Sequence, residues 1–157
     1  MKRFLPKALI VILIPILVMT VIFCSIQTRQ EKVLKSLGKY DSKQVWTHGE
    51  FQDYTDFGKY SYSSAKIDPN EYFEKVSTTD AETICAFIDD FEDWIDTIRN
   101  NDPTDELVSN YSFDRSMMDA EDYFYIYEDE DYSKFGCYDV WFFDSQTKNL
   151  YYFHNNI

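Results

Sequence analysis

The sequence predicts an α+β protein in which an N-terminal transmembrane helix precedes an antiparallel sheet with one main amphipathic helix packed on it. Three observations lead to this prediction. Residues 8–28 carry no charge, residues 80–100 repeat apolar side chains at helical spacing, and aromatic-rich segments elsewhere alternate with turn signals. The length of 157 residues suits one domain with an appendage, since single domains usually run to about 100–200 residues.

The charge of the chain is strongly negative. It has 15 Lys and Arg against 28 Asp and Glu, which gives a formal net charge of -13. Three of the basic residues and none of the acidic ones precede residue 27, so 12 basic face 28 acidic residues in the remainder. Such a surface repels phosphate backbones, which excludes nucleic-acid binding. The aromatic content of 18% favours a compact core with β structure.

The uncharged run of residues 8–28 predicts a transmembrane helix behind a cytoplasmic tail, residues 1–7. At about 1.5 Å per residue, the run spans a hydrocarbon core of about 30 Å. A cleaved signal peptide is the alternative, but the apolar run is longer than a usual signal and no A-x-A-like site follows it. Lipid attachment at Cys24 is disfavoured because bulky Phe23 precedes it. We therefore expect an uncleaved anchor held by the lipid bilayer.

The basic residues on either side of the span are nearly balanced, so they give only a small bias to its orientation. Glu31 interrupts those that follow the span, and long domains cross the membrane largely regardless of their charge. We therefore expect a single-pass protein of the cell membrane with its C-terminal domain outside the cytoplasm. Residues 29–43 read as a juxtamembrane stalk, with Gly38 as a helix stop. This stalk is either a spacer or a basic collar on anionic lipid headgroups.

Residues 44–157 form the predicted extracytoplasmic domain. Two strands are expected around a turn at residues 55–58, and a further strand at residues 123–127. A final hairpin joins residues 138–144 to residues 149–154. Its four-residue loop pairs Asp144 with Asn149, and the resulting register sets three cross-strand neighbours: Asp144 and Asn149, Trp141 and Tyr152, Asp139 and His154.

The main helix is predicted over residues 80–100. Thr79 and Glu82 are spaced as a capping box at its start. The apolar residues fall in one sector that faces a core: Ile84, Phe87, Ile88, Phe91, Ile95 and Ile98. The opposite sector is acidic, with Asp89, Asp93 and Asp96 among its members, and the helix holds no Lys.

This order of elements resembles uncharacterised small membrane-anchored domains of Gram-positive bacteria. The residues that carry the resemblance are Thr79 and Asp80, which open the Ile84-rich helix, and the hairpin of residues 140–152. They cover about a third of the chain. The resemblance implies the same general architecture and transfers no functional residue.

No motif for a nucleotide, a zinc-protease or a redox site is present, and no cofactor is expected. On the predicted register, His154 faces Asp139, and Cys137 lies on the same side of the sheet. A thiol, an imidazole and a carboxylate are the groups that nucleophilic catalysis requires. Because His154 is close to the chain end, where fraying is expected, we assign no catalytic residue. His48 is expected at a loop or strand edge.

Two thiols, Cys85 and Cys137, lie outside the predicted span. Outside the cytoplasm a disulfide between them is chemically permitted, and closing so long a loop would stabilise the fold by roughly 4 kcal/mol. Against it, Cys85 lies about 120° from the centre of the apolar sector of the helix. A disulfide and two separate thiols are therefore both open.

Four consecutive acids form the strongest charged cluster: Glu128, Asp129, Glu130 and Asp131. The simpler interpretation is a solvated face. The alternative is a cationic partner, either a basic protein or a Ca²⁺ ion, which binds clustered carboxylate oxygens. An EF-hand is excluded, because counting from Asp129 places Lys134 at the glycine position and Val140 at the final glutamate position.

Aromatic residues occupy both faces of the strands at residues 123–127 and 151–153, so either both faces are covered or one exposes an aromatic platform. Coverage is favoured because a buried Tyr ring can leave its hydroxyl in water. The sequence thus predicts a non-enzymatic binding or interaction module. An immunity-type or inhibitor protein that neutralises a basic partner is the alternative, and a Cys-dependent hydrolase comes last.

Overall fold

The computed structural model describes residues 28–156 except 51–52, 65–66, 68–70 and 130–134. The chain divides into two compact units, residues 1–36 and 37–157. The predicted transmembrane segment lies outside the described residues, apart from Thr28. Among the described helices, none has the length and apolar character needed to cross a membrane.

In the first unit the structure describes helix α2 (Arg29–Ser36). Thr28 and Glu31 form a reciprocal cap at its start, where each side chain accepts a hydrogen bond from the backbone N–H of the other at 3.2 Å. The helix ends just before Gly38, which adopts a φ of 87°. Gly38 therefore follows the helix end as a stop, as predicted.

The second unit begins at Leu37, earlier than the predicted start at residue 44. It is an α+β fold with a six-stranded antiparallel sheet in the order β1-β2-β6-β5-β4-β3, which confirms the predicted fold class for this part of the chain. The strands are β1 (Ser42–Glu50), β2 (Asp53–Ser61), β3 (Glu74–Lys75), β4 (Tyr123–Glu128), β5 (Cys137–Asp144) and β6 (Asn149–Asn156). The helical elements are α3 (Thr78–Asn101), α4 (Glu106–Asn110) and the 3₁₀ turn η1 (Arg115–Met117).

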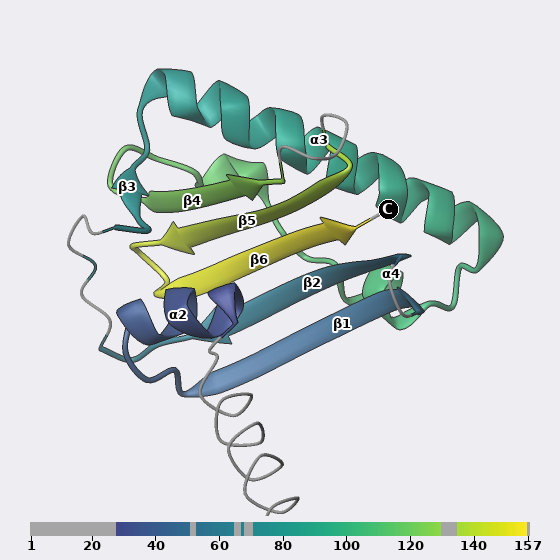
Figure 1. Cartoon of the computed structure of the whole chain (residues 1–157), viewed down its shortest axis with the longest axis horizontal. Helices are drawn as coiled ribbons and strands as arrows, with labels where there is room; N and C mark the ends of the chain where they lie inside the picture. The colour runs from purple at the N-terminus through teal and green to yellow at the C-terminus, as the bar shows by residue number, and fades with distance from the viewer. Residues whose placement is uncertain (1–27, 51–52, 65–66, 68–70, 130–134, 157) are drawn as a thin grey trace, which may run out of the picture. The chain divides into compact units, whose positions relative to one another are not determined.

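Helix α3 runs along one side of the sheet (Figure 1). All six apolar residues predicted to face a core are buried. They pack against one face of β2, β5 and β6, through Phe57, Tyr138, Val140, Phe142, Tyr151 and Phe153. We call this the α3 face of the sheet, and the other side the second face.

The β5–β6 hairpin has the predicted register, with Asp144 opposite Asn149, Trp141 opposite Tyr152 and Asp139 opposite His154. Asp144 fixes the turn, because its Oδ1 accepts hydrogen bonds from the backbone N–H groups of Gln146 and Thr147. Both faces of these strands are buried, on the second face by side chains such as Trp141 and Phe143. The expectation that both faces are covered is therefore confirmed for β5 and β6, whereas β4 is half-buried along its length.

The first hairpin differs from the prediction. The turn expected at residues 55–58 is part of strand β2, and the chain reverses between Glu50 and Asp53. Gly58 serves close packing instead of a turn, since a Cβ there would lie 3.2 Å from the Cβ of Tyr152. Gly49 carries the left-handed backbone, with a φ of 100°, next to the reversal.

The cap of α3 also differs from the prediction. Thr79 lies inside the helix, and Ser77 is the N-cap residue. The Ser77 hydroxyl accepts from the backbone N–H of Asp80, whose carboxylate accepts from the backbone N–H of Ser77. The capping box therefore begins two positions earlier than the sequence suggested, and Asp80 replaces Glu82 in it.

We expect Ser77→Ala to lower the free energy of unfolding by about 1 kcal/mol, because it removes the side-chain acceptor of the capping box. Thr79→Ala, two positions along the same helix, is the matched control and should change stability by less than about 0.5 kcal/mol. Urea denaturation followed by circular dichroism measures both. A larger loss for Thr79→Ala than for Ser77→Ala would contradict the observed cap.

Candidate functional site

A pocket of about 250 Å³ opens at one end of the sheet, where the β1–β2 hairpin meets the C-terminal turns of α3. We call it the end pocket. Trp94 and Ile98 of α3 give it apolar walls, Tyr54 of β2 borders it, and Asp53 and Asn101 add polar groups. Its remaining lining residues are His48, Gly49, Thr55, Thr97 and Asn156.

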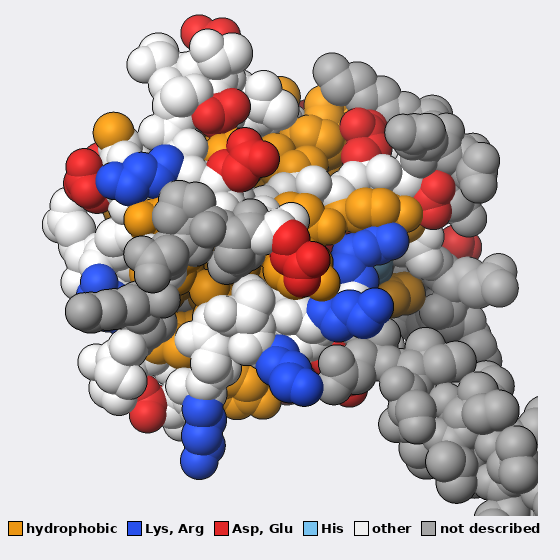
Figure 2. Space-filling view, turned by 60° about the vertical axis from the view of Figure 1, so that its left-hand side comes forward, with side chains coloured by type: hydrophobic (Ala, Val, Ile, Leu, Met, Phe, Trp, Pro, Cys, Tyr) orange, Lys and Arg blue, Asp and Glu red, His pale blue; other side chains and the backbone are white. Residues whose placement is uncertain are grey.

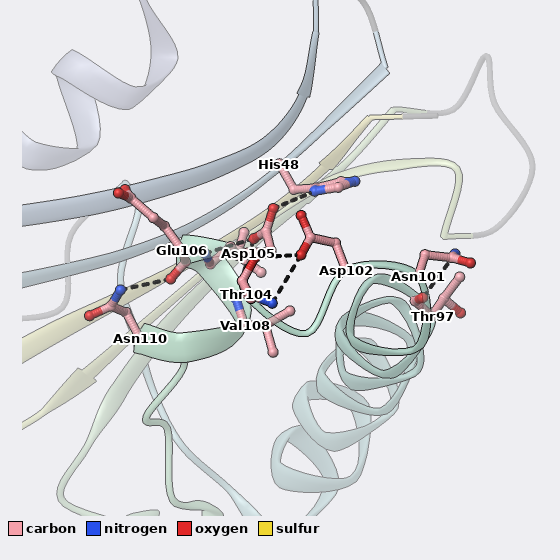
Figure 3. A network of polar contacts seen from close by, with 10 residues as sticks. His48, Thr97, Asn101, Asp102, Thr104, Asp105, Glu106, Val108 and Asn110 are labelled. Atoms are coloured by element: carbon pink, nitrogen blue, oxygen red, sulfur yellow. Dashed lines mark hydrogen bonds and ion pairs between the residues drawn. The ribbon is translucent and has the colours of Figure 1, made fainter.

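His48 lies at this pocket in β1, an edge strand of the sheet, which is one of the two placements expected for it, and it pairs with Asp105 (Figure 3). Its Nδ1 is 2.8 Å from Oδ2 of Asp105. Asp105 is also the N-cap of α4, since its Oδ1 accepts from the backbone N–H groups of Leu107 and Val108. The short helix and the histidine therefore hold each other in place, and sequence reasoning missed this pair because 57 residues separate its members.

Asp102 adds a second carboxylate beside His48 (Figure 3). Hydrogen bonds from the hydroxyl and the backbone N–H of Thr104 lower the pKa of Asp102, and the nearby His48 lowers it further. Asp102 is therefore an anion at neutral pH. The rim of the end pocket is negative, and its walls are apolar.

A second polar group lies on the second face of the sheet, around His154. Oδ1 of Asp139 is 2.7 Å from Nδ1 of His154 and accepts the hydroxyl of Tyr152 at 2.8 Å. His154 and Asp139 are each 9% exposed. The fraying expected at His154 is therefore wrong, because β6 pairs with strands on both sides there and buries the ring.

Cys137 shares this face, as the register predicted, since it precedes Asp139 by two residues on β5. The Nε2 atom of His154, however, has no hydrogen-bond partner among the described residues, so the thiol does not hydrogen-bond to it. Thiol catalysis needs a nucleophile paired with its base, and among the described residues Nε2 of His154 does not make that pairing.

The disulfide considered between Cys85 and Cys137 is not formed in the structure, where both residues are thiols. Cys85 belongs to α3, which covers one face of the sheet, while Cys137 alternates with Tyr138 and so points to the second face. The sheet itself stands between the two sulfur atoms. Sequence spacing could not show this.

Two arginines of the domain pair with three of the acidic side chains of α3. Arg115 of η1 forms ion pairs with Asp89 and Glu92, and Arg99 pairs with Asp96. On the face drawn in Figure 2, acidic and basic side chains are interspersed, with hydrophobic side chains exposed between them. The helix was expected to present a single acidic surface, but a distant arginine divides that surface.

The four-acid run is only partly described. Glu128 accepts a hydrogen bond from the backbone N–H of Phe135, and the backbone N–H of Asp129 donates to the carbonyl of Cys137. Residues 130–131 lie outside the described part of the chain. Among the described residues, no group of three or more His, Cys, Asp or Glu side chains is arranged to hold a metal ion. The calcium site stays a prediction.

One carboxyl of α3, that of Asp90, has a raised pKa, whereas an acid that is well paired has a lowered one. Burial raises the pKa of Asp90, in spite of the hydrogen bond that it accepts from the Tyr138 hydroxyl at 3.0 Å. A raised pKa means that the folded state binds the proton more tightly, so the ionised form costs stability at neutral pH. By contrast, hydrogen bonds from Ser116 lower the pKa of Asp114, whose ionised form therefore stabilises the fold.

We expect Asp90→Asn to raise the free energy of unfolding at pH 7 by well under about 1 kcal/mol, because the amide oxygen still accepts from Tyr138 without a charge and solvent already screens this partly buried carboxylate. The gain should shrink as the pH falls through the folded-state pKa of Asp90, where the wild-type carboxyl becomes neutral. Asp114→Asn should show the opposite sign at pH 7 and also converge with wild type in acid. Chemical denaturation across pH 3–8 measures both, and a gain for Asp90→Asn that persists in acid would refute the assignment.

The end pocket and the His154 cluster both join polar groups to aromatic surface. The first is open, and the second is enclosed. Comparison with known proteins finds no matching family model, no matching curated protein and no matching solved structure.

Proposed function

We propose that this chain is a membrane-anchored binding module that holds its acidic domain outside the cytoplasm and works without catalysis. The uncharged run of residues 8–28 supports the anchor, since it has the length and composition of a membrane span. The lack of a hydrogen bond between the Cys137 thiol and His154 Nε2 supports binding over hydrolysis.

The observation that carries the proposal is the end pocket. It combines an apolar wall, formed by Trp94 and Ile98, with a carboxylate at Asp53 and further negative charge beside His48. Binding sites commonly join an apolar concavity to a few polar groups that fix the orientation of a ligand. The pocket therefore suits a group with an apolar body and a cationic end.

Lysine and arginine side chains have this chemistry, because they bury their methylene stems and keep their charged ends in polar surroundings. The ring of Trp94 can also attract a cation through its face. The large acidic excess of the chain would steer a positively charged partner toward the domain. The proposed ligand is thus a basic side chain on a peptide or protein partner.

An immunity-type or inhibitor role is the alternative, in which the acidic side of α3 neutralises a basic partner. The ion pairs that Asp89, Glu92 and Asp96 make within the domain count against it, since a partner would have to break them. Asp93 is exposed on the same helix, and no ion pair to it occurs among those of the described residues. It therefore distinguishes the two proposals.

We expect the full-length protein in detergent micelles to bind a short lysine-rich peptide, as measured by calorimetry. Trp94→Ala should weaken binding by roughly fivefold, because it removes the aromatic wall. Asp53→Asn should weaken it less, by about twofold to fivefold, and should reduce its salt dependence. Asp93→Asn is the matched control and should leave the affinity unchanged.

A loss of affinity in Asp93→Asn with no change in Trp94→Ala would move the binding surface to the side of α3 and favour the inhibitor role. Equal binding of a glutamate-rich peptide would contradict the proposal that charge selects the ligand. Rapid labelling of Cys137 by a thiol-reactive substrate analogue, abolished by His154→Gln, would favour the hydrolase over both binding roles.

The proposed topology has its own test. Protease added to intact cells should remove the domain from residue 29 onward and leave a short membrane stub, because an uncleaved anchor with its N-terminus inside places the domain outside. Full protection in intact cells, with digestion only after lysis, would reverse the orientation. Loss of residues 1–28 from the mature chain in mass spectrometry would instead show a cleaved signal.

A further inference from the structure

A row of three ionisable side chains crosses the second face of the sheet. Asp56 on β2 is opposite His154 on β6, which is opposite Asp139 on β5. Directly paired residues on antiparallel strands hold their Cβ atoms about 4.5–5.5 Å apart, so the three side chains are neighbours. We call these residues the polar row.

Asp139 determines which nitrogen of the His154 imidazole carries a proton. A carboxylate only accepts, and the same Oδ1 atom takes the hydroxyl of Tyr152 and Nδ1 of His154. Nδ1 of His154 therefore carries a proton. In the neutral ring, Nε2 is then a bare acceptor on the side away from Asp139.

Two atoms of the polar row are buried without a partner among the described residues: Nε2 of His154 and Oδ1 of Asp56. Buried polar atoms are nearly always hydrogen-bonded, and an unpaired one is costly. Both atoms are acceptors when the imidazole is neutral. The group that would satisfy them must therefore donate two hydrogen bonds.

The surroundings favour a positive charge on that group. Among the described residues, no Lys or Arg forms an ion pair with Asp56. The ring of Tyr54 lies 4.7 Å from the His154 ring, and the ring of Tyr152 lies 6.0 Å from it on a near-parallel plane. Burial is the main cause of the raised pKa of Tyr54, and the negative charges of Asp56 and Asp139 raise it further, so both charges act at the Tyr54 side chain.

Tyr54 gives a route to the row. It contacts the His154 ring on the second face of the sheet, so a change of its side-chain rotamer would uncover the row on that face. Rotamer changes of half-exposed side chains are fast compared with ligand binding.

We propose that the polar row is a binding site for a primary ammonium group, which donates one hydrogen bond to His154 Nε2 and one to Asp56 Oδ1 while Tyr54 covers it. Carboxylate and imidazole acceptors between aromatic rings select a cation that carries N–H donors over one that carries none. The site is separate from the end pocket, so a failure of peptide binding there would leave it standing.

Methylammonium chloride is the probe, added to full-length protein labelled with ¹⁵N in its histidine rings. The Nε2 resonance of His154 should shift with saturation as methylammonium is added. Tetramethylammonium, which has the charge but no donor, and NaCl at equal ionic strength should give no saturable shift. His48, which lines the end pocket, reports in the same spectra on amine that binds there instead of in the row.

Asp56→Asn should weaken the methylammonium response by roughly tenfold or more, since it removes the charged acceptor. Asp105→Asn, which alters the carboxylate beside the other histidine, should leave the response of His154 unchanged. If Asp56→Asn does not fold, the difference between methylammonium and tetramethylammonium on the wild-type chain decides the matter.

Equal responses to all three salts would overturn the proposal. So would a wild-type His154 whose Nε2 already carries a proton at neutral pH without amine, because the row would then hold an imidazolium and a bridging water. A saturable methylammonium shift that persists at full strength in a folded Asp56→Asn variant would also overturn it.

Discussion

The burial of the β5–β6 hairpin on both faces is the constraint on which the rest of the domain depends. One face is closed by the apolar stripe of α3, and the other is packed with aromatic rings such as Trp141 and Tyr152, whose centroids lie 4.0 Å apart. A strand buried on both sides cannot place a polar side chain in water. Each polar residue that the hairpin carries must therefore find its partner inside the protein or bind one from outside.

Asp139 and His154 show how that constraint leads from packing to chemistry. Their pairing, with the Tyr152 hydroxyl on the same carboxylate oxygen, satisfies one side of the imidazole and leaves the other side buried. The cost of such an unpaired acceptor is comparable to that of a lost hydrogen bond. A ligand that donates a hydrogen bond to this buried acceptor would therefore recover the free energy that the acceptor loses when the protein folds.

On the surface the constraint is charge repulsion, because the acidic excess would destabilise the domain if it were left unpaired. Arg115 lies between two carboxylates of α3, and Tyr138 donates to a third. The Arg115 contacts hold the segment after α4 against the helix, and the Tyr138 contact joins the helix to β5. The negative charge that remains beside His48 then lies at the end of the sheet, next to the open pocket. The middle of the sheet is closely packed, whereas its end is open. The proposed binding of a basic side chain is therefore placed at the end pocket.

Structural features that depend on residues close together in the chain could be predicted from the sequence. The period of the α3 stripe, from Ile84 to Ile98, and the loop length between Asp144 and Asn149 are local, so they predicted the buried face and the hairpin register correctly. Position along the chain was enough, because neighbouring turns of a helix and paired residues of a hairpin follow fixed geometry.

Contacts between side chains from distant segments of the chain became visible only in the folded structure. Gly58 was predicted to be in a turn, but it lies in a strand, where the absence of a side chain allows Tyr152 to pack closely against it. Arg115 and the acids of α3, or His48 and Asp105, meet because separate elements pack against the same sheet. Cys85 and Cys137 stay apart for the same reason, since the sheet lies between them. Such contacts depend on how the layers stack, which no local pattern encodes, and they determine the candidate sites of this protein.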